Sequence, residues 1–411
     1  MLDVDFTNRL AEDYGTPLVV VDGDQVRARC RELREAFPRV LWAVKAFPAR
    51  ALIRMVRSEG LGLLAATGGE MDACLRAGAE PESIAFHGNN KSDEEIREAT
   101  AKGIGLLIAD NEEELSRIDA FAGRADRTQP ILLRLAPGID VDAHRYVATG
   151  APDTKFGTPL AEGLALRALK QALKLPALDV HGVHVHLGSQ LLESKPYLLG
   201  INAALDFLAE ARRAFGFEGR VLDVGGGMGV AYTDEAPVTA ASLGAELHEV
   251  LAAGCASRDL PVPELIVEPG RAITSGAATT LYRVGSIKEV PGVRTFVAVD
   301  GGMSDNIRPA IYGSRYTVTL ASRDSSSDQR VVTVVGRHCE SGDVLARDVS
   351  LPTDLRRGDL IAFSSTGAYE YAMSSNYNKV GRPAVVAITN GEPRLIIRRE
   401  TADDLARLDV D

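Results

Sequence analysis

The feature that most constrains this chain is a regular alternation of short apolar runs with stretches of helical periodicity, between about residues 40 and 270. Runs of this length and composition are typical of strands buried on both faces. Eight strands alternating with helices predict a (β/α)8 barrel, because such barrels have a typical length of about 250 residues. The strands are expected at residues 39–46, 60–65, 83–88, 103–110, 130–137, 180–188, 220–227 and 264–270.

An open, doubly wound parallel sheet is the alternative fold. It would place a glycine-rich nucleotide fingerprint directly after the first strand. The segment "VKAFPAR" at residues 44–50 has no glycine. The barrel is therefore the favoured fold class, within the α/β class.

The pattern changes after about residue 275. Short runs rich in β-branched residues, separated by turn residues, predict a mainly antiparallel β domain. The run "TPLVVVDG" at 16–23 is a further strand that can join it. We therefore expect a barrel domain over 24–274 and a discontinuous β domain made of 1–23 and 275–411, with a short closing helix capped by Thr401.

Composition narrows the class of partner. The formal net charge is −11, which argues against nucleic acid or an anionic membrane as the main partner. No apolar run approaches the roughly 20 residues that span a bilayer. Four scattered cysteines suggest neither a disulfide framework nor a zinc cluster. With no apolar leader at the N-terminus, we expect a cytoplasmic protein that acts on a small molecule.

Several polar residues follow predicted barrel strands, where the active sites of such barrels lie. Lys45 ends the first strand, and either reaches solvent or serves as a Schiff-base lysine in a partly apolar site. His186 and Ser189 follow the sixth strand, and the triple glycine at 225–227 follows the seventh. Glycine backbone can approach an anion closely, so this loop, with Ser189 and Arg271, predicts a phosphate site.

Glu268 and two histidines indicate which molecule the bound phosphate belongs to. Glu268 follows the eighth strand, and either forms a salt bridge or pairs with a ring nitrogen. His184 and His186 face the same way on a strand, but no third ligand is adjacent in sequence, so no metal is expected. A lysine, a phosphate cradle, a flat histidine and a carboxylate at one barrel mouth together describe pyridoxal 5′-phosphate (PLP).

At these motifs the chain resembles the fold-type III PLP-dependent decarboxylases, and most closely the diaminopimelate decarboxylases. The resemblance runs from about residue 14 to the C-terminus, and it implies the family fold, an alanine-racemase-like barrel with a β domain. It is carried by "AVKAF", "TGGEM", "HGNNKS", "DTKFG", "HVHLGSQ", "DVGGGMGV" and "EPGRAI", and later by "VDGGMSDNIRPAIYGSRY", "GRHCESGDVL" and "STGAYEYAMSSNYN".

The resemblance implies a role for each matching residue. Lys45 would be the Schiff-base lysine, His186 would stack on the cofactor ring, and Glu268 would pair with the ring nitrogen. The phosphate would be held by Ser189, Gly226, Gly227, Gly270 and Arg271, with Tyr369 near phosphate or substrate. The distal end of the substrate would be bound by Arg271, Arg308, Tyr312 and Glu340, and Tyr369 is also among the substrate-binding residues. Cys339 would be the proton donor, and Cys339 and Glu340 would complete the site of the other subunit of a homodimer.

The implied reaction is decarboxylation of meso-2,6-diaminopimelate to L-lysine and CO2, a carbon–carbon lyase step of lysine biosynthesis. Arginines suit the distal carboxylate of this substrate, and a glutamate suits its distal ammonium. The family usually has an acid where this chain has Leu64, and often an asparagine where it has Phe47. Leu64 leaves open a relative that decarboxylates another amino acid. An amino-acid racemase is less favoured, because it would need a second base opposite the lysine and because the "CESGD" cysteine fits decarboxylation better. A non-enzymatic PLP-binding protein is less favoured, because it would lack the C-terminal domain and the "CESGD" motif.

Overall fold

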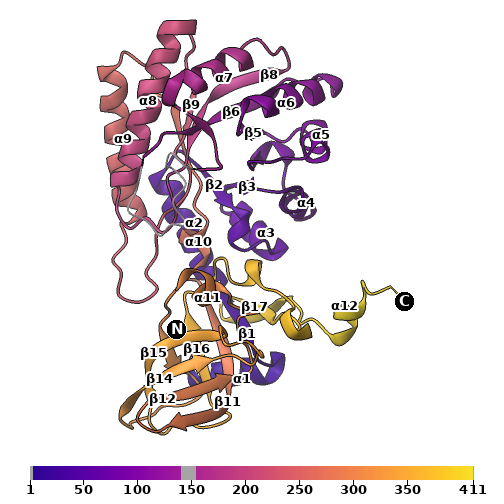
Figure 1. The fold of residues 1–411 in the computed structure, drawn as a ribbon, viewed down its shortest axis with the longest axis vertical. Helices are drawn as coiled ribbons and strands as arrows, with labels where there is room; N and C mark the ends of the chain where they lie inside the picture. Colours follow the sequence, from indigo (N-terminus) through magenta and orange to yellow (C-terminus); the bar gives the residue numbers. More distant parts are fainter. Residues whose placement is uncertain (1–2, 140–153, 411) are drawn as a thin grey trace. The chain divides into compact units, whose positions relative to one another are not determined.

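The computed structural model describes residues 3–139 and 154–410, and the chain forms two compact units (Figure 1). The first unit comprises residues 1–26, 231–235 and 274–411, and the second comprises 27–230 and 236–273. Asp153, the first residue of the "DTKFG" motif, lies outside the described residues. Among the described helices, none combines the length and the apolar character that crossing a membrane requires.

The second unit is a closed barrel of eight parallel strands, as the alternating pattern predicts. Each strand pairs with its neighbours along the chain, and the ring closes where the last strand pairs with the first. All eight expected strands are present, and most begin or end within a few residues of the predicted bounds. They are β2 (Arg39–Ala43), β3 (Gly62–Ala65), β4 (Ile84–Phe86), β5 (Leu106–Ala109), β6 (Gln129–Ala136), β8 (Leu178–Val185), β9 (Val221–Asp223) and β10 (Glu264–Val267).

Helices follow these strands on the outside of the barrel (Figure 1). Their ends are set by local signals. Ser92 and Glu95 form a capping box at the start of α5, and Gly103 ends that helix in the left-handed conformation. The helices are α3 (Arg50–Ser58), α4 (Gly68–Arg76), α5 (Asp93–Lys102), α6 (Glu112–Arg124), α7 (Leu164–Ala172), α8 (Lys195–Phe215), α9 (Ala240–Ser257) and α10 (Arg271–Thr274).

Apolar side chains fill the barrel interior, so it is a packed core and not a channel. One buried cluster joins residues from seven of the strands, Leu64 among them at 4% exposure. The position that is usually acidic in the resembling family therefore belongs to this core. The cluster consists of Leu41, Ala43, Leu64, Ala85, Leu106, Ile108, Leu132, Val221 and Ile266.

The first unit is built on a nine-stranded, mostly antiparallel sheet. The N-terminal strand β1 (Leu18–Asp22) lies between β11 and β17, antiparallel to the former and parallel to the latter. The other strands are β11 (Ala278–Val290), β12 (Arg294–Val299), β13 (Val318–Leu320), β14 (Gln329–Val335), β15 (Val344–Pro352), β16 (Leu360–Ser364), β17 (Ala384–Thr389) and β18 (Glu392–Ile397).

Among the described residues, a short strand β7 (Thr158–Pro159) also pairs with β6, and four further α-helices are present. They are α1 (Val4–Tyr14), α2 (Gly23–Ala36), α11 (Arg308–Tyr312) and α12 (Ala402–Ala406). Thr401 caps α12, as expected from the sequence. Strand β15 was not expected, because Arg347 and Asp348 interrupt its apolar run and Asp348 takes a φ of 52° within the strand.

Candidate active site

Lys45 lies just past the end of a barrel strand. Strand β2 stops at Ala43, and Lys45 occupies a 3-10 turn over Val44–Ala46 that the N–H of Phe47 closes onto the carbonyl of Val44. The expected strand to residue 46 is therefore three residues too long, because the turn begins at Val44. The Lys45 residue is exposed, and its charge still acts on buried groups of the barrel: burial and Lys45 together lower the pKa of His186 to about 3.

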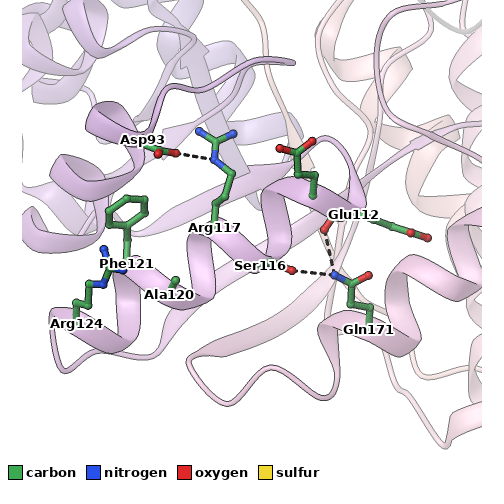
Figure 2. Close-up of a pocket in the computed structure, with 9 residues that line it drawn as sticks. Asp93, Glu112, Ser116, Arg117, Ala120, Phe121, Arg124 and Gln171 are labelled. Carbon is green, nitrogen blue, oxygen red and sulfur yellow. Dashed lines mark hydrogen bonds and ion pairs between the residues drawn. The ribbon is translucent and has the colours of Figure 1, made fainter.

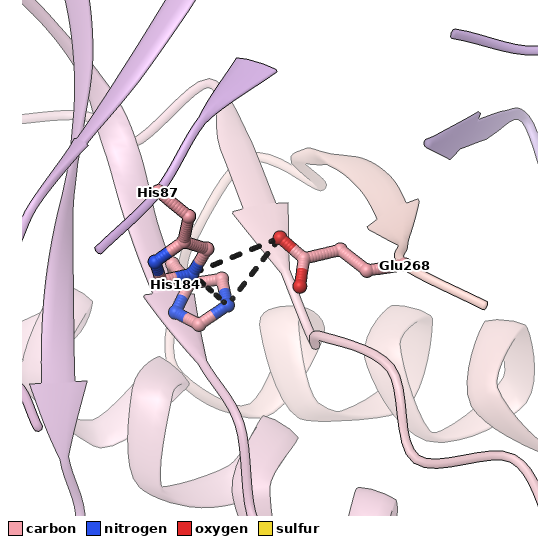
Figure 3. A group of neighbouring side chains, drawn as sticks. All are labelled: His87, His184 and Glu268. Atoms are coloured by element: carbon pink, nitrogen blue, oxygen red, sulfur yellow. Dashed lines mark hydrogen bonds and ion pairs between the residues drawn. The ribbon is translucent and has the colours of Figure 1, made fainter. Parts of the chain in front are cut away.

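Glu268 follows β10 and faces two imidazoles (Figure 3). Its Oε1 atom lies 3.5 Å from Nε2 of His184 and 3.9 Å from Nε2 of His87. The two imidazole nitrogens are 3.2 Å apart. All three side chains are buried, with Glu268 6% exposed and His184 fully enclosed. The strands bring together residues that are far apart in sequence, because β4, β8 and β10 all end at the same rim.

The groups around Glu268 at this rim favour its ionised form. Burial raises the pKa of Glu268, but His184, His186 and Lys45 outweigh it and lower the pKa of this carboxyl. The neighbouring Asp223 has the opposite shift, because burial and then the charge of Glu268 raise its pKa. We infer that the pair holds one negative charge, on Glu268, since two adjacent buried carboxylates do not readily both ionise.

The His87, His184 and Glu268 group also has the composition of a cation site, with its three ligand atoms within 4.8 Å of one another. Its hydrogen bonds argue against that use. The N–H of Gly88 donates to Nδ1 of His87 at 3.1 Å, so the proton of the neutral ring is on Nε2. A ligating nitrogen needs a lone pair. Nε2 of His87 is thus better placed to donate to His184 than to bind a metal.

The triple glycine after β9 forms a loop that admits no side chains. A Cβ atom at Gly226 would lie 2.3 Å from the carbonyl oxygen of Glu268, and one at Gly227 would lie 2.3 Å from that of Gly188. The hydroxyl of Tyr197 donates to the Gly226 carbonyl, and Leu191 N–H donates to that of Gly227. These bonds fix the orientation of the loop's peptide groups.

Arg271 and Ser189 meet beside this part of the barrel. Arg271 begins α10, is 6% exposed, and donates from Nη2 to Oγ of Ser189 at 3.1 Å. Gly270 directly precedes it. A guanidinium, a hydroxyl and a glycine loop are the donor types that hold a phosphate.

The predicted residues of the β unit differ in how far they are buried. Arg308 starts α11 and is buried. Its Nε donates to the hydroxyl of Tyr316 at 3.1 Å, and its guanidinium lies 5.3 Å from the ring of Tyr312. Cys339 and Glu340 are both exposed. Tyr369 is half-buried and takes a φ of 62°.

Sequence reasoning assigned no role to a second set of buried polar groups in the barrel. Lys91 is 2% exposed and donates to the carbonyls of Gly88 and Ile108 and to both oxygens of Glu114. Arg134 lies 3.8 Å from Asp110. The "HGNNKS" segment could have predicted a role for His87 and Lys91, since polar residues directly follow a predicted strand there.

A hollow of about 560 Å³ lies elsewhere, on the outer helical face of the barrel (Figure 2). Gln171 of α7 donates to the carbonyl of Glu112 and to Oγ of Ser116 in α6, and Arg117 pairs with Asp93. It contains none of the predicted site residues. It is lined by Asp93, Glu112, Glu113, Ser116, Arg117, Ala120, Phe121, Arg124 and Gln171.

Comparison with known proteins identifies the family. Residues 23–275 match the pyridoxal binding domain of the pyridoxal-dependent decarboxylases. The chain belongs to this family. It is 43% identical to the diaminopimelate decarboxylase of Mycobacterium leprae over 98% of this chain and 88% of the relative. It is 41% identical to that of Bacillus subtilis, over 98% and 93%.

A solved structure resembles the whole chain. The crystal structure of diaminopimelate decarboxylase from M. jannaschii in complex with L-lysine is 32% identical, with a TM-score of 0.93. The match covers 99% of this chain and 94% of that one. The fold is therefore the alanine-racemase-like barrel with its β domain, and the cofactor of the family is PLP. The donor set of the barrel fits PLP, because it combines a lysine, a buried carboxylate and a side-chain-free glycine loop beside an arginine.

Proposed function

We propose that this protein decarboxylates meso-2,6-diaminopimelate to L-lysine and CO2. The observation that carries the proposal is identity of 39–44% to diaminopimelate decarboxylases over 98% of this chain. This chain also carries the "NIRPAIY" and "CESGD" segments, whose arginine and glutamate suit the two distal charges of this substrate.

PLP, when bound, supplies an aldehyde that condenses with amines and a ring that accepts electrons. Lys45 would hold the aldehyde carbon between turnovers, and its exposed position past β2 allows an incoming amine to replace it. Arg271, Ser189 and the loop at Gly226 and Gly227 would hold the phosphate. His186 would lie flat on the ring.

Glu268 would keep a proton on the ring nitrogen, because a buried carboxylate favours a positive partner. The single negative charge of the Glu268–Asp223 pair suits this task. Arg308, Tyr312, Glu340 and Tyr369 would bind the distal end of the substrate. Cys339 would deliver a proton to the carbon that loses CO2.

We further propose a cytoplasmic homodimer, in which Cys339 and Glu340 of each subunit complete the site of the other. The exposure of both residues in the single chain supports this assembly. Four free thiols suit a reducing compartment.

Leu64 favours a second candidate function. An apolar residue in the barrel core replaces the acid that the family usually has, which would suit a PLP decarboxylase of another amino acid.

The test is CO2 and lysine release from PLP-loaded protein given meso-diaminopimelate, L-lysine, L-ornithine or L-glutamate. We expect lysine from diaminopimelate only, with loss of turnover in Lys45→Ala and normal turnover in the exposed control Lys102→Ala. CO2 release from another substrate, with none from diaminopimelate, would replace the first proposal with the second.

A further inference from the structure

The loop that carries Cys339 is braced within its own unit. It connects β14 to β15 and runs from Gly336 to Asp343. The buried carboxylate of Asp343 accepts from the N–H of His338 at 2.8 Å and from that of Met303 at 2.6 Å. The N–H of Gly336 donates back to the carbonyl of Asp343. The two ends of the loop are thus held together, with Cys339 near its tip.

A second set of contacts holds the Cys339 residue itself. His338 is 8% exposed, and both nitrogens of its ring have a partner. Nδ1 lies 3.2 Å from Oδ1 of Asn378, and Nε2 lies 2.8 Å from Oγ of Ser304. The same Oδ1 atom of Asn378 accepts from the backbone N–H of Cys339 at 3.2 Å. We call Ser304, His338 and Asn378 the Cys339 clamp.

The clamp is consistent with one tautomer of a neutral histidine. An amide oxygen only accepts, so Nδ1 of His338 carries the proton and donates to Asn378. Nε2 then accepts from the hydroxyl of Ser304, which is itself 1% exposed. Every polar atom of the ring has a partner, so the ring has a fixed orientation.

Asn378 also holds an uncommon backbone conformation. Its φ is 53°, in the left-handed region, which asparagine tolerates better than most residues. This conformation accompanies a side chain that reaches both the ring of His338 and the amide of Cys339. The Asp343 contacts hold the ends of the loop, whereas Asn378 contacts Cys339 itself, whose thiol the proposed function uses.

We propose that Asn378, through the Cys339 clamp, is a positioning residue that sets the direction of the Cys339 thiol. This inference rests on the proposed function, in which the thiol gives its proton to the substrate carbon and regains one from solvent. Orienting a proton donor affects the rate of the step more than substrate binding.

The test compares Asn378→Gly with Asn378→Asp in the full-length holoenzyme. Glycine keeps the positive φ without strain and removes the acceptor, whereas aspartate keeps the acceptor. Asn390→Gly, at an exposed turn with a φ of 52°, is the matched control. Hydrogen exchange of the Cys339 amide, resolved by fragmentation, is measured beside kcat and KM for diaminopimelate.

In Asn378→Gly we expect Cys339 amide exchange to accelerate by roughly two- to tenfold, the factor for one net hydrogen bond. We expect kcat to fall by about tenfold with KM changed less than about twofold, since a displaced donor slows chemistry more than binding. Asn378→Asp stays closer to wild type in both amide exchange and kcat, and the control Asn390→Gly matches wild type in both. In a Cys339→Ala background, Asn378→Gly lowers kcat by less than about twofold further, because it acts through the thiol.

Wild-type kcat in Asn378→Gly, or an undiminished effect in the Cys339→Ala background, would overturn the inference while leaving the proposed function standing. Wild-type kcat in Cys339→Ala would instead remove the proton-donor role from the proposed function, and the inference with it.

Discussion

At the scale of single residues, Asp305 in the β unit is a buried acid in an acidic neighbourhood. It is 6% exposed, and its Oδ2 accepts from the N–H of Gly302 at 2.9 Å. Burial, with smaller contributions from Asp300 and Asp343, raises the pKa of Asp305 to about 7. The folded state therefore binds a proton between about pH 4 and 7 that the unfolded chain releases, and stability falls as pH rises through this window.

We predict that Asp305→Asn stabilises the protein by about 4 kcal/mol at pH 8 and by only about 1.5 kcal/mol at pH 5. The asparagine oxygen can still accept from Gly302, and it has no charge to bury. Denaturant unfolding at the two pH values measures the difference, with the exposed Asp324→Asn as control. Equal effects of Asp305→Asn at both pH values would contradict the assigned proton.

At the scale of secondary-structure elements, Gly182 sets how closely two barrel strands approach. The register of β8 against β6 shifts between Ile131 and Leu132, so that Leu132 pairs with Gly182 and His181 is passed over. A Cβ atom at Gly182 would lie 1.9 Å from the carbonyl oxygen of Val221 in β9. Strand β8 also carries His184, so this pairing places a site residue.

We predict that Gly182→Ala destabilises the barrel by more than about 3 kcal/mol, because the backbone of β9 cannot move aside cheaply. Gly123→Ala in α6 is the control. Its Cβ would meet only Ala177 at 3.8 Å, and alanine favours helix by roughly 0.5–1 kcal/mol. Thermal unfolding of the two variants gives the comparison. A Gly182→Ala protein as stable as Gly123→Ala would show that the two strands can separate.

The elements also show what a sequence pattern can and cannot predict. Eight apolar runs were enough to predict all barrel strands, because period and composition are local properties. The turn at Lys45 was missed, since Val44 and Ala46 continue the apolar run without a turn residue. His87 was not linked to Glu268 either, because only the closed ring of strands brings the ends of β4 and β10 together.

At the scale of the whole molecule, the two units carry buried groups with opposite responses to pH. The barrel holds His87, His184 and His186, whose pKa values are all lowered, first by burial. Below about pH 6.5 these histidines bind protons in the unfolded chain but stay neutral in the folded barrel. Acid therefore destabilises the folded barrel. Asp305 makes the β unit respond in the other direction, losing stability as pH rises.

We therefore predict that acidification from pH 7 to pH 5 weakens the barrel by about 1–3 kcal/mol per pH unit. Each ring leaves up to one proton to the unfolded chain, whereas Asp223, whose pKa is raised, keeps one in the folded barrel. Trp42, the one tryptophan of the chain, is buried in β2, so its fluorescence reports unfolding of the barrel. His184→Gln should reduce the slope of the free energy of unfolding against pH, because it removes one group that binds a proton only in the unfolded chain. The exposed His248→Gln should leave this slope unchanged. A Trp42 transition whose midpoint is constant between pH 5 and 7 would mean that the folded barrel takes up these protons. The imidazoles beside Glu268 would then be cationic, and that carboxylate would already have its positive partners before any ring nitrogen reached it.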